Sequence, residues 1–273
     1  KFSAYQIDQI INGIEGQLAS LDGKSDFSEK DDKRECLFSA SMIEVPYDED
    51  YKNIVRRIIQ EGIKSFHMDV GDGIFITRKI SSLDKVRYLR KTYPELSIHC
   101  HLMVNSPHDF RKNGLSYIEE YVRGGCDHVA VHERSFDSKE DLISGLNQIR
   151  NLGAKAGLII ETDRVVDQGL FDTILEHELD WAVMMGVVVG YGGQIFDNNV
   201  LLKIKALDNY FRSIGKPFTI EVDGGLTMEN VSLCKRAGAQ ILSGWSIINA
   251  ENSEQICGKL RVVNSILNPH EAL

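Results

Sequence analysis

The chain has 273 residues, of which 42% are hydrophobic and 26% are charged, and its formal net charge is −9. This length suffices for one large α/β barrel or for two ordinary domains. The acidic balance argues against nucleic acid or an anionic membrane as a partner, and no apolar stretch is long enough to predict a membrane span.

The first 35 residues differ in pattern from the rest of the chain. Their apolar residues recur at helical spacing, which predicts an amphipathic helix. The polar stretch 22–34 contains chain breakers and favours a linker. We therefore expect residues 1–35 to be an N-terminal helix and polar linker, with the helix packed on the outside or across one end of the following domain, or mediating self-association. The apolar positions are Ile7, Ile10, Ile11, Ile14, Leu18 and Leu21.

Residues 36–273 alternate between short β-branched runs and longer helical patterns. Eight strand–helix units in about 235 residues predict an α/β fold, a (β/α)₈ TIM barrel. An open doubly wound sheet is the alternative, but no G-x-G-x-x-G motif follows the first strand. The predicted strands are 36–40, 65–70, 96–101, 127–131, 155–160, 181–186, 217–222 and 240–243. The predicted helices are 49–62, 80–92, 108–123, 138–152, 165–176, 199–214, 228–237 and 251–267.

Four polar residues lie at the ends of predicted strands. His67 and Asp69 share one face of the second strand, His101 ends the third and Asp223 ends the seventh. The active sites of such barrels lie at the C-terminal ends of the strands, so these side chains should converge. Two imidazole nitrogens and two carboxylate oxygens suit one divalent ion: Zn²⁺, Fe²⁺, Mn²⁺ or Co²⁺. Each residue taken alone is also compatible with a structural role.

Glycine-rich segments follow the last three predicted strands, at 190–194, 223–225 and 243–246. Glycine lets backbone N–H groups approach a phosphate, and the loops after strands seven and eight commonly bind phosphate in these barrels. The alternative is that they are only tight turns. The candidate substrate-binding residues in these loops are Gly190, Tyr191, Gly192, Gly193, Gly224, Gly225, Trp245 and Ser246.

Five scattered cysteines form no C-x-x-C pair, and four of them lie in predicted strands or helices. A free cysteine in such a place behaves as a small hydrophobic residue. The N-terminus lacks the apolar core of a signal peptide. We therefore expect a reducing, cytoplasmic location.

Several motifs together resemble the ribulose-phosphate 3-epimerase family, in order and in spacing, from about Leu37 to Ile248. The motifs are His67-x-Asp69-Val-x-Asp72-Gly73-x-Phe75, His101-Leu-Met103-Val104, Met185, Gly190-Tyr-Gly-Gly-Gln194-x-Phe196 and Glu221-Val-Asp223-Gly-Gly225. The first predicted strand, Leu37-Phe-Ser39-Ala40, also resembles that of the family.

The resemblance implies a metal held by His67, Asp69, His101 and Asp223, with Asp69 and Asp223 as the catalytic acid/base pair. It further implies that Ser39 and His101 contact the substrate, that Met103 and Met185 form an apolar wall, and that the protein is a homo-oligomer. The implied activity is metal-dependent 3-epimerisation of a ketose phosphate, by default D-ribulose 5-phosphate to D-xylulose 5-phosphate, by two-carboxylate proton transfer through an enediolate.

The chain departs from the family pattern near the expected site. Gly71 stands where the family usually has Met, and His99 replaces a common Asp; we interpret His99 as a filler of the barrel. Glu161-Thr162 and Val188-Val189 replace two Asn-Pro pairs, and Trp245-Ser246 replaces Gly-Ser. We interpret His132 and Glu133, at the end of the fourth strand, as structural.

Three alternatives remain beside the default reaction. The first is epimerisation of another ketose phosphate, such as a ketohexose 6-phosphate. The second is a decarboxylase related to orotidine-phosphate decarboxylase, which is discounted because D-x-K-x-x-D is absent from the end of the third strand. The third is a non-catalytic barrel that binds sugar phosphates.

Overall fold

The computed structural model describes residues 35–191, 193–250 and 252–268. The helix expected within residues 1–35, and Gly192 of the candidate phosphate loop, lie outside the described residues. Among the helices that are described, none combines the length and the apolar composition needed to cross a membrane.

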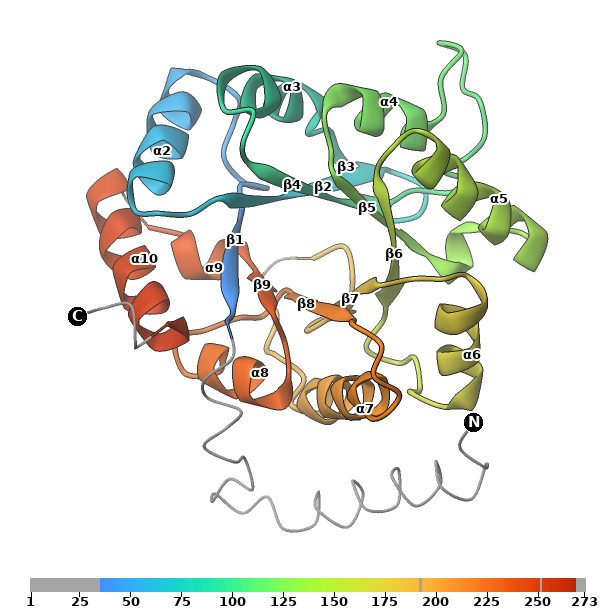
Figure 1. Cartoon of the computed structure of the whole chain (residues 1–273). Coiled ribbons are helices and arrows are strands. Elements are labelled where there is room, and N and C mark those ends of the chain that lie inside the picture. The colour runs from blue at the N-terminus through green and yellow to red at the C-terminus, as the bar shows by residue number, and fades with distance from the viewer. Residues whose placement is uncertain (1–34, 192, 251, 269–273) are drawn as a thin grey trace.

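The described chain forms a closed barrel of eight parallel strands surrounded by helices (Figure 1). The barrel closes because β1 pairs with β2 on one side and with β9 on the other. A two-residue strand, β3 (Lys79–Ile80), adds to β2 in the antiparallel direction. The barrel strands are β1 (Leu37–Ser41), β2 (Ser65–Asp72), β4 (Ser97–Met103), β5 (His128–His132), β6 (Lys155–Ile160), β7 (Trp181–Met185), β8 (Thr219–Asp223) and β9 (Ile241–Ser243). The predicted barrel is confirmed.

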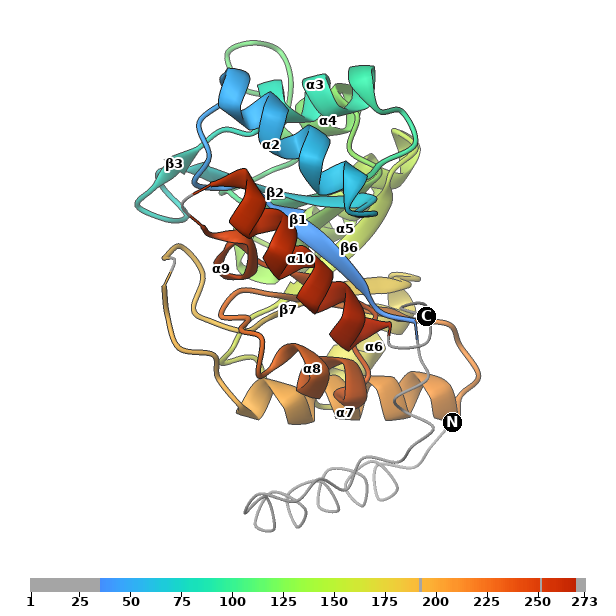
Figure 2. The same cartoon turned by 90° about the vertical axis from the view of Figure 1, so that its left-hand side faces the viewer.

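The helices lie outside the strands, and Figure 2 shows α2, α10 and α8 covering one side of the barrel. Several begin at a side chain that accepts a backbone N–H of the first turn, as Asp48, Ser138 and Asp167 do. The helices are α2 (Glu49–Gln60), α3 (Leu83–Thr92), α4 (Tyr117–Gly124), a 3₁₀ turn (Glu133–Ser135), α5 (Lys139–Asn151), α6 (Gln168–Glu176), α7 (Asn199–Ser213), α8 (Val231–Ala237), α9 (Trp245–Ile248) and α10 (Ser253–Leu267).

One predicted helix is half as long in the structure. The pattern predicts helix over 108–123, but α4 begins only at Tyr117. Ser116 caps it by accepting the backbone N–H of Glu119 at 3.0 Å. Gly114 has a φ of +77°, which ends any regular helix before that cap. The apolar positions of 108–116 therefore belong to a loop.

The two faces of the barrel strands line two buried regions of different polarity. The layer between strands and helices is a continuous apolar core. Inside the barrel, the side chains alternate with those facing the helices, and many are polar. In the pairing of β2 with β4, Asp69 lies beside His101. In the pairing of β7 with β8, Met185 lies beside Asp223. The register thus brings the polar strand ends to one mouth of the barrel.

Candidate active site

Four buried side chains converge at the C-terminal mouth of the barrel. His67 and Asp69 come from β2, His101 from β4 and Asp223 from β8, and one ligand-type atom from each lies within 4.8 Å of the others. All four residues are less than a tenth exposed. The structure therefore brings together the set that the strand ends predicted.

The spacing of these atoms fits a metal ion. His67 Nε2 lies 3.5 Å from Asp69 Oδ1 and 3.5 Å from Asp223 Oδ2. His101 Nδ1 lies 3.6 Å and 3.3 Å from the same two oxygens. A tetrahedral ion with bonds of about 2.0–2.1 Å places its ligand atoms about 3.3–3.4 Å apart. His67 Nε2 and His101 Nδ1 are also buried with no hydrogen-bond partner, as metal-binding nitrogens would be. The residues present can hold a divalent cation.

The charges of this cluster are strongly coupled. Burial alone would lower the pKa of His67 and of His101, but Asp69 and Asp223 outweigh it and raise both pKa values. Burial alone would raise the pKa of Asp69, but the two histidines hold it below its usual range. The cluster therefore carries two carboxylates that favour a positive charge between them, either as protons on the histidines or as a cation.

The buried carboxylate of Glu221 forms a hydrogen bond with the ring nitrogen of His67 that faces away from the cluster. Glu221 Oε1 lies 2.8 Å from His67 Nδ1, and Glu221 Oε2 lies 2.8 Å from His99 Nδ1. Trp181 Nε1 and Ser243 Oγ also donate to this carboxylate. Burial alone would raise the pKa of Glu221, but His99 and His67 hold it well below the usual value. His99, expected to be a filler, is thus a hydrogen-bond partner of Glu221.

A second chain of polar side chains supports His101. His132 Nε2 lies 2.9 Å from His101 Nε2, and His132 Nδ1 lies 2.7 Å from Glu161 Oε1. Burial lowers the pKa of His132 to about 4, although Glu161 opposes it. Burial would raise the pKa of Glu161, but bonds from His132 and Arg134 lower it to about 2. His132 is therefore neutral and Glu161 ionised at neutral pH.

A cavity of about 330 Å³ opens above the four side chains. Asp69 and Asp223 line it, and Ser39 does not: its hydroxyl is fully buried and accepts a bond from Ser65. The other candidate substrate-binding residues of the described chain all line the cavity: His101, Met103, Met185, Gly190, Tyr191, Gly193, Gly224, Gly225, Trp245 and Ser246.

Backbone shape explains the glycines of the loop after β8. Gly224 and Gly225 have φ values of +89° and +67°, where other residues are strained. A Cβ atom on Gly225 would also lie 3.0 Å from Phe196 Cα and 2.7 Å from a Val187 methyl. This loop can therefore follow its path along the cavity only with glycine at both positions.

Several cavity residues were not identified from the sequence, among them Ser41, Glu44 and Arg78. Ser41 donates to Asp69 Oδ2 at 3.0 Å. Glu44 and Arg78 form an ion pair at the rim. The alternation of a strand could have found Ser41, because it shares a face with Ser39. No short-range pattern pairs Glu44 with Arg78, because they lie in loops after different strands.

Met103 and Met185 line the cavity as the apolar wall, and Ile76 is a further member that was not expected from the sequence. A Cβ atom on Gly71 would lie 2.7 Å from Ile76 Cδ1, so Ile76 fills the space that a side chain at position 71 would need. Ile76 packs in one buried cluster with Met103 and Met185. The loss of a side chain at Gly71 is thus compensated by the loop that follows β2.

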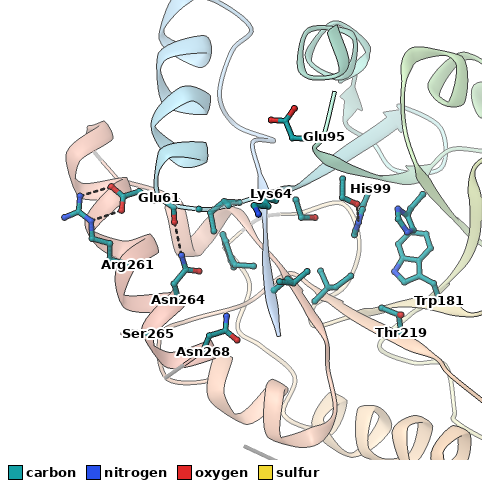
Figure 3. Close-up of a pocket in the computed structure, with 18 of the residues that line it drawn as sticks. Glu61, Lys64, Glu95, His99, Trp181, Thr219, Arg261, Asn264, Ser265 and Asn268 are labelled. Atoms are coloured by element: carbon teal, nitrogen blue, oxygen red, sulfur yellow. Dashed lines mark hydrogen bonds and ion pairs between the residues drawn. The ribbon is translucent and has the colours of Figure 1, made fainter. Parts of the chain in front are cut away.

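A second cavity, of about 680 Å³, lies at the opposite end of the barrel (Figure 3). His99 and Trp181 lie at its inner wall, and Glu61, Arg261 and Asn264 lie at one side. The N-terminal ends of the strands surround it, so it is remote from Asp69 and Asp223. Within the described part of the chain, its titratable groups do not form a ligand cluster like that at the other mouth.

Fold and site together define a class of protein: a (β/α)₈ barrel with a buried two-histidine, two-carboxylate cluster beneath a glycine-lined cavity. The comparison with known sequences is more specific. Residues 38–248 match the Ribulose-phosphate 3 epimerase family. A ribulose-phosphate 3-epimerase of Synechocystis sp. is 34% identical over 212 residues, which cover 75% of this chain and 84% of that protein.

The chain belongs to the ribulose-phosphate 3-epimerase family and is an enzyme of the isomerase class. The ribulose-phosphate 3-epimerase, cytoplasmic isoform, of Oryza sativa subsp. japonica is 29% identical over 207 residues, which cover 75% of this chain and 84% of that protein. The tryptophan synthase alpha chain of Legionella pneumophila subsp. pneumophila has a TM-score of 0.60 at 14% identity, with 98% of each chain covered. That likeness concerns the fold alone.

Proposed function

We propose that this enzyme interconverts D-ribulose 5-phosphate and D-xylulose 5-phosphate by moving a proton at C3. The observation that carries the proposal is the placement of Asp69 and Asp223, which come from different strands and line one cavity. Inverting a carbon beside a ketone requires removal of a proton from one face and its return to the other. Two carboxylates that reach one substrate from separate strands can perform both transfers.

The residues around Asp69 and Asp223 fix the positions of the two carboxylates. Ser41 holds Asp69 by donating to Oδ2, which leaves Oδ1 toward the centre of the cluster. The backbone N–H of Gly186 donates to the carbonyl oxygen of Asp223 at 2.7 Å and fixes the end of β8. Met103 and Met185 line the cavity, with Ile76 packed against them in one buried cluster, and this apolar wall would exclude water from the reacting carbon.

His67, Asp69, His101 and Asp223 would hold the cation. A divalent cation bound there supplies Lewis acidity, which stabilises the negative charge that develops on the substrate oxygens. The donor set of two nitrogens and two oxygens suits Zn²⁺, Fe²⁺, Mn²⁺ or Co²⁺. We propose one ion per subunit.

The phosphate of the substrate would bind at the glycine-lined side of the cavity. Gly190, Gly224 and Gly225 leave backbone groups open to the cavity, and Trp245 begins the short helix α9 beside them. Anchoring the phosphate there would place C3 between the two carboxylates.

The five buried, free cysteines support a reducing, cytoplasmic location. We also propose that the protein is a homo-oligomer, because the family resemblance implies one.

Deuterium exchange at C3 of D-ribulose 5-phosphate tests the proposal. We expect Asp223→Asn to reduce exchange by about a thousandfold, because loss of a general base costs about 10²–10⁴ in rate. Asp167→Asn, at the N-terminus of α6, should leave exchange unchanged since asparagine also caps helices. Near-normal exchange in Asp223→Asn would rule out the two-carboxylate mechanism. Exchange with a ketohexose 6-phosphate but not with a pentulose phosphate would reassign the substrate.

A further inference from the structure

We propose that Glu161 is a positioning residue of the metal centre, which acts through His132 to hold His101 in the tautomer that turns a bare Nδ1 toward the cation. The inference rests on the proposed function insofar as His101 is a metal ligand. Glu161 lies just after β6, at a position where the sequence departs from the family pattern.

The three side chains form one line across neighbouring strands. His101 is on β4, His132 ends β5 and Glu161 follows β6. The ring nitrogens His101 Nε2 and His132 Nε2 are 2.9 Å apart, and His132 Nδ1 is 2.7 Å from Glu161 Oε1. His101 and His132 are about 1% and 0% exposed, so water does not replace these contacts.

Glu161, at the outer end of the three side chains, sets the direction of both hydrogen bonds. Arg134, which can only donate, binds the same Oε1 atom of Glu161, so this oxygen is an acceptor and His132 donates its Nδ1–H to it. With the His132 proton on Nδ1, its Nε2 is bare and can only accept, so His101 donates its Nε2–H across the 2.9 Å contact. His101 is left with a bare Nδ1, and that atom is the one that faces Asp69 and Asp223 without a hydrogen-bond partner.

Glu161 is itself held in place from the outside. Arg134 Nε donates to the same Oε1 atom at 2.6 Å. The Arg134 guanidinium lies 3.9 Å from the centre of the Phe75 ring, and that ring lies 4.6 Å from the His132 ring. The carboxylate therefore has one fixed orientation, although its side chain is 21% exposed.

An amide at position 161 would remove this directionality. A glutamine offers both an N–H₂ donor and a C=O acceptor, so His132 could carry its ring proton on Nε2 instead and accept a hydrogen bond at Nδ1. His132 would then donate from Nε2, and His101 would have to carry its proton on Nδ1. In that arrangement His101 cannot bind a cation. Only an acceptor at position 161 excludes it.

The test measures Zn²⁺ affinity of the full chain by competition with a chelator at pH 7.5. Outer partners of metal-binding histidines commonly contribute 10–100-fold to affinity. We expect Glu161→Gln and Glu161→Ala to raise the Kd for Zn²⁺ at least tenfold. The matched control is Glu133→Gln, whose carboxylate pairs with Arg164 and lies outside the chain of bonds. It should leave the Kd unchanged.

A second measurement needs no variant. In ¹H–¹⁵N spectra of the Zn²⁺-loaded wild type, His101 should carry its ring proton on Nε2 and His132 on Nδ1. The opposite assignment for His132 would overturn the proposal, as would unchanged Zn²⁺ affinity in both Glu161 variants. If the wild type binds Zn²⁺ but does not exchange the C3 proton, the proposed function fails while this inference stands. If it exchanges the proton and the Glu161 variants bind Zn²⁺ normally, only this inference fails.

Discussion

At the scale of single residues, the barrel interior depends on carboxylates that only accept hydrogen bonds. Glu221 is fully buried and receives donors from His67, His99, Trp181 and Ser243. A buried charge is tolerated only where its hydrogen-bonding capacity is satisfied, and here both oxygens have two donors. The same carboxylate orients His67, so stability and the candidate metal centre share one residue.

This arrangement predicts the effect of Glu221→Gln. A glutamine presents an N–H₂ donor in place of one of the two oxygens, so the two groups that donate to that oxygen lose their hydrogen bond or, where they are a histidine or a serine, must reverse it. Each unsatisfied buried donor costs about 1–3 kcal/mol. We expect the free energy of unfolding, measured with urea at pH 7 on metal-free protein, to fall by about 3 kcal/mol. Glu133→Gln, in an ion pair whose side chains are 29% and 33% exposed, should leave it unchanged. An equal loss in both variants would contradict the assigned role of Glu221.

The pH dependence of unfolding provides a further check on Glu221. Its pKa in the folded protein lies well below the usual value, so its stabilisation is complete above that usual value. The stabilisation is lost as the pH falls toward the pKa in the folded state. The difference in stability between wild type and Glu221→Gln should therefore shrink when the pH is lowered from 5 to 3. A difference that grows on acidification would show that the carboxylate is not the stabilising form.

At the scale of the elements, β6 and β7 fit together because β6 lacks a side chain at one inward position. A Cβ atom on Gly157 would lie 2.1 Å and 2.4 Å from two ring atoms of Trp181. Trp181 is 2% exposed and its indole nitrogen is bound to Glu221, so the ring cannot turn away. Gly157 therefore allows the largest side chain inside the barrel to reach its partner.

Two alanine substitutions separate this packing from the general effect of glycine. Gly157→Ala should lower the free energy of unfolding by about 2 kcal/mol, as overpacking a core does. Gly258→Ala, within α10 and with no neighbour within 4 Å of the added Cβ, should raise it by about 1 kcal/mol. Urea titration of both variants measures the two values. A stabilised Gly157→Ala would contradict the close contact with Trp181.

The sequence predicts the barrel strands better than the helices, for a physical reason. A strand buried on both faces is a short apolar run bounded by turns, and the eight runs are found within a few residues of their predicted places. A helix boundary depends on a single cap. Ser116 could be recognised as a cap only once Gly114 before it is known to have a positive φ. The predicted helix over 108–123 therefore began too early.

At the scale of the whole molecule, the strand ends were predictable because the barrel fold itself fixes where they meet. The compensating contacts were not. Ile76 fills the space beside Gly71, and Glu161, just after β6, reaches His132 on the neighbouring strand β5. Neither pair shows a sequence periodicity, because Ile76 reaches Gly71 through the path of the loop after β2 and Glu161 reaches His132 through the pairing of β5 with β6. Departures from the family pattern thus need the tertiary structure before their effect can be judged.

The candidate metal centre joins β2, β4 and β8, so metal binding should stabilise the whole barrel. A ligand that binds only the folded protein adds about 2.7 kcal/mol when its concentration is 100 times its Kd. For a chain of this size that corresponds to about 5–10 °C in Tm. We expect removal of the metal with a chelator to lower the Tm by this amount, measured by calorimetry, and Zn²⁺ to restore it.

The metal-free barrel should nevertheless remain folded. The raised pKa values of His67 and His101 indicate that protons can occupy the space between Asp69 and Asp223 when no cation is bound. Repulsion between the two carboxylates is thereby relieved in either state. His67→Gln, which removes one ligand, should largely abolish the rise in Tm on adding Zn²⁺. A rise of full size in this variant would place the stabilising ion elsewhere in the molecule, and the four side chains at the mouth would no longer explain it.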